Sequence, residues 1–274
     1  MKIAFSSLRP DARAVWLVAA FAAISVTQVA AQETRRYVTT DQGGVYIESP
    51  MGAMEVEAEG YSEVRFEISG TSIIAKYDTL YSYVGGSQGD QSPDVTPIME
   101  GSFELEMERP GVLVTLSHPS VEAEGAGGME PLHMFDDFLV PLPDEPLAVG
   151  VEWTEMMVHD GASQPDATYY SERAMSMRVE RDTVVNGEPA FVVSVAQNVT
   201  NESSGIMPGM GFEFTSSSDG TDNGTAILAG DGTLLHRERT IEMAGLFSIM
   251  LQGQVFDMPQ TMSFTGTQKL VADN

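Results

Sequence analysis

The sequence predicts an all-β protein: a curved antiparallel sheet of about a dozen strands, with at most one short helix. Two observations support this fold class. Apolar and charged residues alternate along many short segments, and turn-forming sequences separate those segments. Successive side chains of a strand point to opposite faces, so strict alternation is typical of antiparallel strands that bury one face only.

Three segments in the first half of the chain show the alternation most clearly. They are residues 54–59, 63–68 and 103–108, in which a charged residue occupies every second position. A helix would instead repeat its apolar residues about every 3.6 positions. We therefore expect strands there. Further strands are expected at residues 73–84, 112–117, 153–158, 175–185, 190–196, 211–215, 225–228, 234–243, 246–252 and 262–271.

Short turn sequences connect neighbouring strands into hairpins. Asn186-Gly187 lies between two strand-like segments, and Asn-Gly is a strong signal of a two-residue hairpin turn. Pro110-Gly111 and Gly230-Asp231-Gly232 separate two further pairs. Residues 85–97 and 198–209 are rich in glycine, serine, asparagine, aspartate or proline, so we expect loops there.

Residues 122–150 interrupt the strand pattern. Pro131, followed by apolar residues at 132, 135, 138 and 139, allows one short helix at 131–139, which prolines at 141, 143 and 146 would end. Nothing here resembles a long flexible linker. We expect one β-rich domain at residues 32–274, with a seam near 122–150 between two β-rich halves.

The first 31 residues resemble a signal peptide. Basic residues at 2, 9 and 13 precede an apolar run at 14–26, and Val29-Ala30-Ala31 supplies a small-x-small cleavage site. A membrane-spanning helix needs about 20 apolar residues, which is longer than this run. The chain has no cysteine, so no lipid can be attached at a cleavage-site cysteine. We expect cleavage after Ala31 and a periplasmic or extracellular protein without a membrane anchor.

The chain is strongly acidic. Its 40 acidic and 14 basic residues correspond to a formal charge of −26 at pH 7. Removing residues 1–31 takes away three basic residues and one acidic residue, which leaves 39 acidic and 11 basic residues and a charge of −28. This charge disfavours nucleic acids and anionic membrane surfaces as partners. It suits saline surroundings, where screening weakens self-repulsion, or it serves solubility alone.

The sequence lacks common catalytic signatures. It contains no Gly-x-Ser-x-Gly elbow, no His-Glu-x-x-His helix and no phosphate-binding loop, and without cysteine it has no thiol nucleophile. Asp219-Gly220-Thr221 and Asp231-Gly232-Thr233 reverse the order found in aspartic proteases, so we interpret both as turns. We expect a protein that is not an enzyme and needs no cofactor.

Metal binding has only weak candidates. His133 and Asp137 would share one face of the expected helix, with Asp136 beside them, and the alternative is a surface histidine in an acidic protein. Asp219 and Asp222 in a glycine-rich stretch offer oxygen ligands for calcium, and the alternative is a plain turn. Because the four histidines are scattered along the chain, we expect no tight transition-metal site.

Two stretches resemble a family of uncharacterised exported bacterial β-rich proteins. Residues 139–153 (LVPLPDEPLAVGVEW) resemble their Leu-Pro-x-x-Pro followed by Val-Gly-Asp-x-Trp, with Val151 in place of the usual aspartate. Residues 224–228 and 232–240 resemble a hairpin of the same family. The resemblance covers the C-terminal half and implies no activity. The architecture is also similar to that of lipoprotein carriers, whose half-barrels hold lipid in a concave face.

The leading functional hypothesis is that a concave β-sheet binds an apolar or amphipathic, lipid-like ligand. Methionines such as Met54, Met107, Met175 and Met177 lie on apolar strand faces, where they would line a core or an adaptable pocket. The alternative is a structural or protein-interaction module with a filled core and an envelope protein as partner. Strongly charged outer faces and the lack of aromatic girdles disfavour an outer-membrane barrel.

Overall fold

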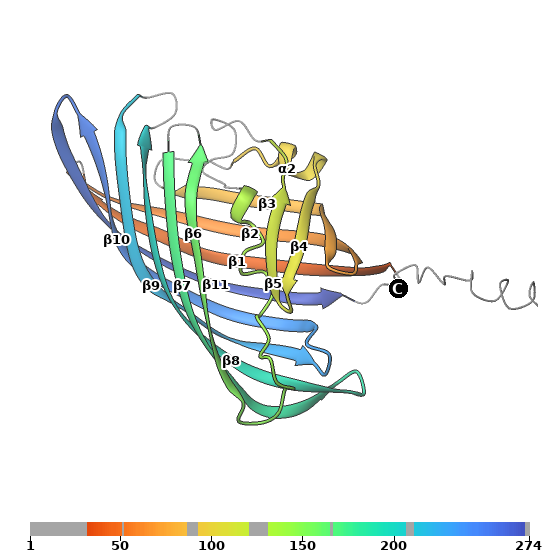
Figure 1. Ribbon diagram of the computed structural model, residues 1–274. Helices are drawn as coiled ribbons and strands as arrows, with labels where there is room; N and C mark the ends of the chain where they lie inside the picture. The colour runs from red at the N-terminus through yellow and green to blue at the C-terminus, as the bar shows by residue number, and fades with distance from the viewer. Residues whose placement is uncertain are drawn as a thin grey trace, which may run out of the picture. The chain divides into compact units, whose positions relative to one another are not determined.

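The computed structural model describes residues 32–50, 52–86, 93–120, 131–164, 167–206 and 211–271. The expected signal peptide at residues 1–31 lies outside these described residues. The described residues form one antiparallel sheet of eleven strands, which is not closed, and one short α-helix (Figure 1). This arrangement confirms the predicted all-β fold class.

Every strand pairs with its neighbour in sequence, except where the chain passes from β5 to β6. In addition β1 pairs with β11, so that the first and last strands meet inside the sheet while β5 and β6 form its edges. The strands are β1 (Glu33–Ser49), β2 (Gly52–Ser69), β3 (Ser72–Gly86), β4 (Phe103–Arg109), β5 (Val112–Ser117), β6 (Glu152–Gln164), β7 (Ala167–Val185), β8 (Glu188–Ile206), β9 (Glu213–Ala229), β10 (Leu234–Leu251) and β11 (Gln254–Val271), with the helix α2 (Thr96–Glu100) before β4.

Many strands are longer than the sequence predicted. The loop expected at 198–209 is wrong for its described part, because β8 continues to Ile206. The turn expected at Asp219-Gly220-Thr221 is also wrong, because these residues lie within β9. Both segments are paired along their length, with Thr200 opposite Asp219. Polar residues are tolerated on the outer face here because it meets solvent, and Thr200 donates a 2.7 Å hydrogen bond to Asp219 there.

Two hairpin turns share one backbone conformation. Asn186 and Gly187 have positive φ angles of 52° and 88°, as the Asn-Gly sequence predicts. Gln252 and Gly253 have φ angles of 52° and 80° and connect β10 to β11, although this turn has no Asn-Gly signal. Positive φ at both central residues is the property of the type I′ turn, whose twist matches that of the flanking strands.

Residues 131–151 form a capping segment that packs on one face of the sheet, which we call the inner face. It begins with a 3₁₀ turn at Pro131–His133, so the helix expected at 131–139 is wrong beyond its first turn. The α-helix α2 begins instead at Thr96, near the end of the loop predicted at 85–97, and continues beyond it to Glu100. In the capping segment, i to i+3 backbone bonds continue to Phe138, whose amide donates to the Phe135 carbonyl at 3.2 Å.

Aromatic rings of the capping segment fill the core. The Phe135 ring centroid lies 4.9 Å from that of Phe103 and 5.7 Å from that of Phe66. The Phe138 ring lies 5.0 Å from Phe66 and 5.4 Å from Tyr37. The core cluster also includes residues of β6 to β10, so the segment packs between strands from both sides of the sheet. The stretch that the sequence marked as a seam therefore contributes to the shared core.

The capping segment also ties the two edges of the sheet together. The amide of Leu142 donates a 3.0 Å hydrogen bond to the carbonyl of Pro110, between β4 and β5. The indole of Trp153 in β6 donates a 2.9 Å bond to the carbonyl of Pro141. Arg109 and Glu155 form an ion pair between β4 and β6. These contacts hold the edges near each other without strand-to-strand hydrogen bonds.

Candidate ligand-binding face and charge network

Six charged side chains meet between the inner face and the capping segment. We call them the charge network. Its members are Asp41 of β1, Asp137 of the capping segment, Arg173 of β7, Asp222 of β9, and Arg237 and Arg239 of β10. Three arginines face three aspartates, so the network is balanced when every group is ionised.

Asp137 lies at the centre of this network. Its Oδ2 atom lies 2.8 Å from Nη1 of Arg173 and accepts a 3.0 Å hydrogen bond from Nη1 of Arg239. Its backbone carbonyl accepts a 2.7 Å hydrogen bond from Nη1 of Arg237. Burial alone would raise the pKa of Asp137, but the charges of Arg173, Arg239 and Arg237 outweigh burial and hold that pKa well below its usual range.

The other two aspartates are less well compensated. Asp222 lies 3.4 Å from Nη1 of Arg239 and 3.5 Å from Nη2 of Arg237, and burial raises its pKa despite both charges. Asp41 lies 4.0 Å from Arg239, and burial raises its pKa as well. The pKa values of carboxyl groups in one network are thus shifted in opposite directions, because only Asp137 has close contacts with all three arginines.

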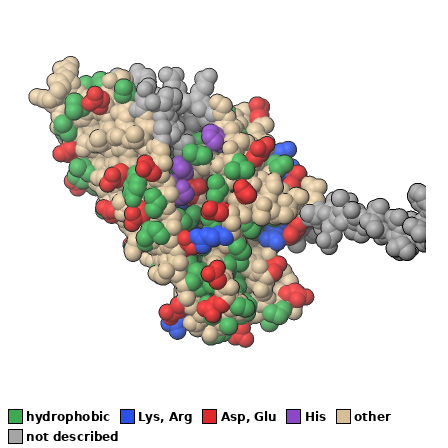
Figure 2. Space-filling view, in the orientation of Figure 1, with side chains coloured by type: hydrophobic (Ala, Val, Ile, Leu, Met, Phe, Trp, Pro, Cys, Tyr) green, Lys and Arg blue, Asp and Glu red, His purple; other side chains and the backbone are tan. Residues whose placement is uncertain are grey.

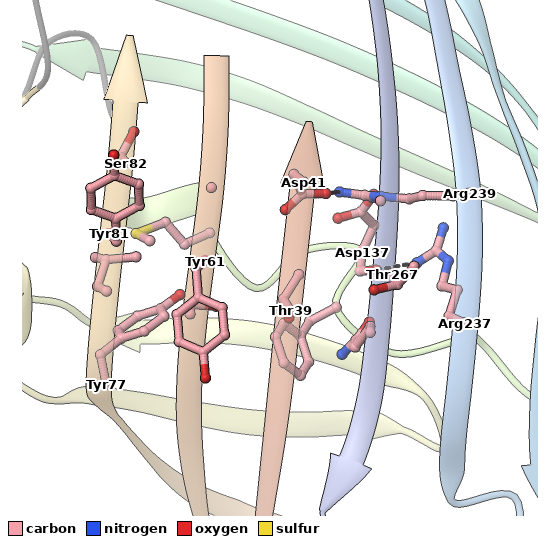
Figure 3. A pocket seen from close by; sticks show the side chains of 17 residues that line it. Thr39, Asp41, Tyr61, Tyr77, Tyr81, Ser82, Asp137, Arg237, Arg239 and Thr267 are labelled. Atoms are coloured by element: carbon pink, nitrogen blue, oxygen red, sulfur yellow. Dashed lines mark hydrogen bonds and ion pairs between the residues drawn. The ribbon is translucent and has the colours of Figure 1, made fainter. Parts of the chain in front are cut away.

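Glycines make room for the network on the inner face. In register across the strands lie Gly60 of β2, Asp41 of β1, Gly266 of β11 and Arg239 of β10. A Cβ atom at Gly266 would overlap the carboxylate of Asp41. The missing side chain therefore lets Asp41 and Arg239 reach toward each other across β11, as Figure 3 shows.

A cavity of about 230 Å³ lies beside the network, between the capping segment and the sheet (Figure 3). Its walls combine polar and apolar groups, as is common in small-molecule sites. They include Asp41, Asp137, Arg237 and Arg239 of the network, with Thr39, Ser62, Tyr77, Leu80, Met134, Phe138 and Gln268.

Three residues that line this cavity carry buried polar atoms without a hydrogen-bond partner among the described residues. The atoms are Oγ1 of Thr39, Nε of Arg237 and Nε2 of Gln268. Buried polar groups are nearly always hydrogen-bonded to protein or to water, so these atoms favour a polar occupant of the cavity. All three can donate a hydrogen bond, which favours an occupant that carries acceptor atoms.

Beyond the network, the inner face becomes apolar. We call this region the open apolar face. None of its side chains is fully buried and none belongs to the core cluster, although the same face is covered at the other end of the strands. Its side chains are Val45, Ile47, Val56, Phe214, Ile241, Met243, Phe247, Ile249, Phe256, Met258, Met262 and Phe264.

The cavity and the open apolar face adjoin each other. Gly266 and Arg239 line the cavity, and two positions further along the same strands lie Phe264 and Ile241, which are opposite each other. Along β10, the open apolar face extends from Ile241 to Ile249, which at ~3.3 Å per residue is ~26 Å. The outer face differs, since Glu55, Glu57 and Glu59 of β2 are exposed there. Acidic side chains are also scattered over the surface seen in Figure 2.

A second polar group lies near β6, where the capping segment meets the edge of the sheet. Oδ2 of Asp136 lies 2.7 Å from Nδ1 of His133 and 3.3 Å from Nε2 of His159. The two imidazole rings are 5.1 Å apart, and the His133 ring lies 5.0 Å from that of Tyr169. We call His133, Asp136 and His159 the histidine cluster. Burial lowers the pKa of His159, although Asp136 opposes this shift.

The structure separates several residues that the sequence grouped as metal candidates. His133 is paired with Asp136, while Asp137 contacts the arginines, because the segment is not the expected helix. Asp219 and Asp222 lie in β9, not in a loop. Asp219 accepts a 2.7 Å hydrogen bond from Thr200 on the outer face, and Asp222 is buried on the inner face. These two cannot ligate one calcium ion together.

The sequence reasoning missed the arginines of the charge network. The sequence did contain a signal for them. Arg237 and Arg239 occupy every second position of the same strand as Ile241 and Met243, so the alternation places all four side chains on the inner face. Asp41 is likewise in phase with Tyr37. A charged residue in phase with an apolar strand face indicates a buried polar site. The partners of these residues could not be inferred, because they are distant in sequence.

Comparison with known proteins identifies no family. No protein-family model and no curated protein matches the chain. Among solved structures, Neisserial surface protein A (NspA) is 11% identical, with 86% of this chain and 98% of that chain covered and a TM-score of 0.24. OccK5 (OpdH) of Pseudomonas aeruginosa is 8% identical, with 88% and 99% covered and a TM-score of 0.26.

These similarities are distant. TM-scores this low carry no conclusion about fold, location or function, so the resemblance to exported bacterial proteins found in the sequence stays a resemblance. No helix in the described part of the chain has the length and apolar character that crossing a membrane requires.

Proposed function

We propose that this is an exported protein of the cell envelope that binds an amphipathic, lipid-like molecule on the inner face of its sheet, without catalysing a reaction. The apolar part of the ligand lies along the open apolar face, and its polar part occupies the cavity at the charge network. The observation that carries the proposal is the continuity of these two surfaces through Arg239, Ile241, Gly266 and Phe264.

Three features favour an extended amphipathic ligand over a small polar one. The apolar strip on β10 is ~26 Å long, which suits a hydrocarbon chain. Its side chains are mainly phenylalanine, methionine and β-branched residues, and methionine adapts to irregular apolar ligands. Covering half-buried side chains removes apolar surface from water, at roughly 25 cal/mol per Å², which supplies affinity.

The polar end of the ligand is expected to carry hydrogen-bond acceptors. Thr39, Arg237 and Gln268 each have a buried donor that no group in the described part of the chain accepts. A carboxylate, a phosphate or an ester carbonyl satisfies such donors, whereas an ammonium group does not. The proposed ligand class is therefore a fatty acid or another lipid with an acceptor-rich head.

A matched pair of variants tests the apolar part of the proposal. Phe247 lies on the open apolar face, and the neighbouring Leu246 lies on the outer face, where it is 37% exposed. Binding of a fluorescent fatty acid to the mature protein should weaken by about tenfold or more in Phe247→Glu, equivalent to at least ~1.4 kcal/mol. Leu246→Glu should leave the affinity unchanged.

Native mass spectrometry of the protein from its host provides an independent test. Co-purifying lipid supports the proposal. Equal loss of affinity in both variants, or a protein that carries and binds no lipid, contradicts it and favours a structural or interaction module. A dimer that is lost in Phe247→Glu would show instead that the open apolar face is covered by a second copy of the chain.

A polar variant tests the other end of the site. Thr39→Val removes a buried hydroxyl that forms no hydrogen bond with residues the structure describes, so the free energy of unfolding should stay the same or rise slightly. The same change should weaken binding of the fatty acid, because its head loses a hydrogen bond. Unchanged affinity would place the ligand head elsewhere.

A further inference from the structure

The histidine cluster has a composition suited to a metal ion. Two imidazoles and one carboxylate are typical ligands of zinc and of other divalent first-row transition metals. One ligand atom from each of His133, Asp136 and His159 lies within 4.8 Å of the other two. Three protein ligands are too few to complete a tetrahedral shell, so one position remains for water or another molecule.

The distances are close to those of a coordinated ion. In a tetrahedral zinc site with bonds of ~2.0 Å, ligand atoms lie ~3.3 Å apart. Oδ2 of Asp136 lies 3.3 Å from Nε2 of His159 and 2.7 Å from Nδ1 of His133. Only a small opening of the shorter contact is needed, and that contact joins two side chains of the capping segment.

The surroundings hold the three side chains in place. Their exposed fractions are 18% for His133, 7% for Asp136 and 20% for His159. Tyr169 packs on the ring of His133. Nε2 of His159 is buried and forms no aligned hydrogen bond, although Asp136 is near. A buried nitrogen that lies 3.3 Å from a carboxylate oxygen without hydrogen-bond alignment is placed as two ligands of one ion would be, which is the second observation that points to a ligand.

Neighbouring charges leave Asp136 available. The adjacent Asp137 contacts Arg173 and Arg239, so the arginines of the charge network are compensated there. Among the described ion pairs, Asp136 contacts only the two histidines. Asp136 therefore contacts the two imidazoles, whereas Asp137 contacts the arginines.

The geometry points to a divalent transition-metal site formed by His133, Asp136 and His159, at which the ion would fasten the capping segment to the edge strand β6. The site is independent of the lipid-binding proposal, because none of its three residues lines the cavity or the open apolar face. Its donors favour zinc or copper over calcium and magnesium, which prefer oxygen ligands.

Calorimetry on the mature, chelator-treated protein tests this site. Zn²⁺ is titrated in moderate salt with excess Mg²⁺, which occupies the exposed carboxylates of this acidic chain. We expect one zinc ion per chain and a higher melting temperature with zinc, since the folded state alone brings the ligands together. Stoichiometry well above one, or competition by Mg²⁺, would show nonspecific binding and overturn the assignment.

Variants identify the ligands. His159→Ala and Asp136→Asn should each weaken zinc binding by ~100-fold or more, because loss of an outer-shell partner already costs 10–100-fold. His118→Ala and His236→Ala are matched controls on exposed histidines and should bind as the wild type does. Circular dichroism without zinc checks that each variant folds, and His133→Ala replaces any that does not.

X-ray absorption of the zinc-loaded protein gives a direct readout. Two imidazole nitrogens in the first shell support the site, and their loss in His159→Ala confirms the assignment. A shell of oxygen atoms only, or zinc affinity that is unchanged in both His159→Ala and Asp136→Asn, would overturn it.

Discussion

The two ends of the inner face have similar side chains but different surroundings. At one end, Phe66 and Phe103 are each no more than 1% exposed, because Phe135 and Phe138 of the capping segment pack on them. At the other end, the one ring that contacts Phe247 among the described residues is Phe214, at a centroid distance of 6.0 Å, and both side chains remain partly exposed. The charge network lies between these regions.

This difference separates what stabilises the fold from what is available for binding. Apolar surface that the chain covers by itself contributes to stability. Apolar surface left partly open stays in unfavourable contact with water until a ligand or a partner covers it. The same alternating pattern in sequence therefore serves two purposes, depending on whether another part of the chain reaches that portion of the sheet.

The largest expected effect comes from removing a ring at the covered end. Phe135→Ala should lower the free energy of unfolding by about 3–5 kcal/mol, because it leaves a cavity among Phe66, Tyr77 and Phe103. Phe247→Ala, the matched change on the open apolar face, should cost less than about 1 kcal/mol. Denaturant unfolding of both variants measures the difference, and equal losses would contradict the comparison.

A similar loss is expected in the charge network. Asp137→Asn should cost about 3 kcal/mol at neutral pH, because Arg173 loses its carboxylate partner and Arg239 keeps only the more distant Asp222 and Asp41. The depressed pKa of Asp137 means that its contribution is complete above the unfolded pKa near 4 and is lost as pH falls through the folded pKa. As the pH is lowered, the free energy of unfolding should therefore fall less in Asp137→Asn than in the wild type.

Asp222 provides a control, because its pKa is shifted in the direction opposite to that of Asp137. Its pKa is raised, so its contribution is complete below the unfolded pKa near 4 and is lost as pH rises through the folded pKa. Asp222→Asn should consequently cost less than Asp137→Asn at neutral pH and should flatten the stability profile on the alkaline side of pH 4. Identical pH profiles for the two variants would show that these carboxyl groups are not distinguished as we describe.

An intermediate effect is expected where the two regions meet. Gly266→Ala should destabilise the protein by about 1–3 kcal/mol, because its Cβ would overlap the carboxylate of Asp41 and lie 3.5 Å from Cγ of Arg239. Gly161→Ala in β6, where a Cβ meets no atom within 4 Å, is the control and should be nearly neutral. Thermal unfolding of both variants tests whether the glycine accommodates the network.

The smallest effect is expected when salt screens the net negative charge of the protein. A mature charge of −28 opposes compaction, and NaCl shortens the screening length from ~30 Å at ~0.01 M to ~3 Å at ~1 M. At neutral pH the melting temperature should rise modestly with NaCl, and KCl should act similarly. A flat or falling melting temperature would mean that the acidic side chains are dispersed or neutralised, and would remove the argument for saline surroundings.

Much of the fold followed from local pattern. Alternation identified β2, β4 and most other strands, and Asn186-Gly187 identified a hairpin that the structure confirms. Polar stretches were missed: β1 was not predicted, and only the two ends of β9 were, because the serine, aspartate and glycine residues in the middle of β9 resemble a loop in sequence. Of the candidate sites, His133 and Asp136 were named, but His159 was not grouped with them, because only the packing of the capping segment on β6 brings it near.

By itself the sequence determined the strand character of the chain, its acidic outer face and the amphipathic pattern of each strand, because these depend on neighbours one or two positions apart. The tertiary structure decided where the capping segment packs, and hence which apolar side chains are core and which stay open. It also decided the sites: Arg239 meets Asp137 across 102 positions of sequence. Pairing of β1 with β11 and packing of the capping segment create these contacts, and neither can be read from local periodicity.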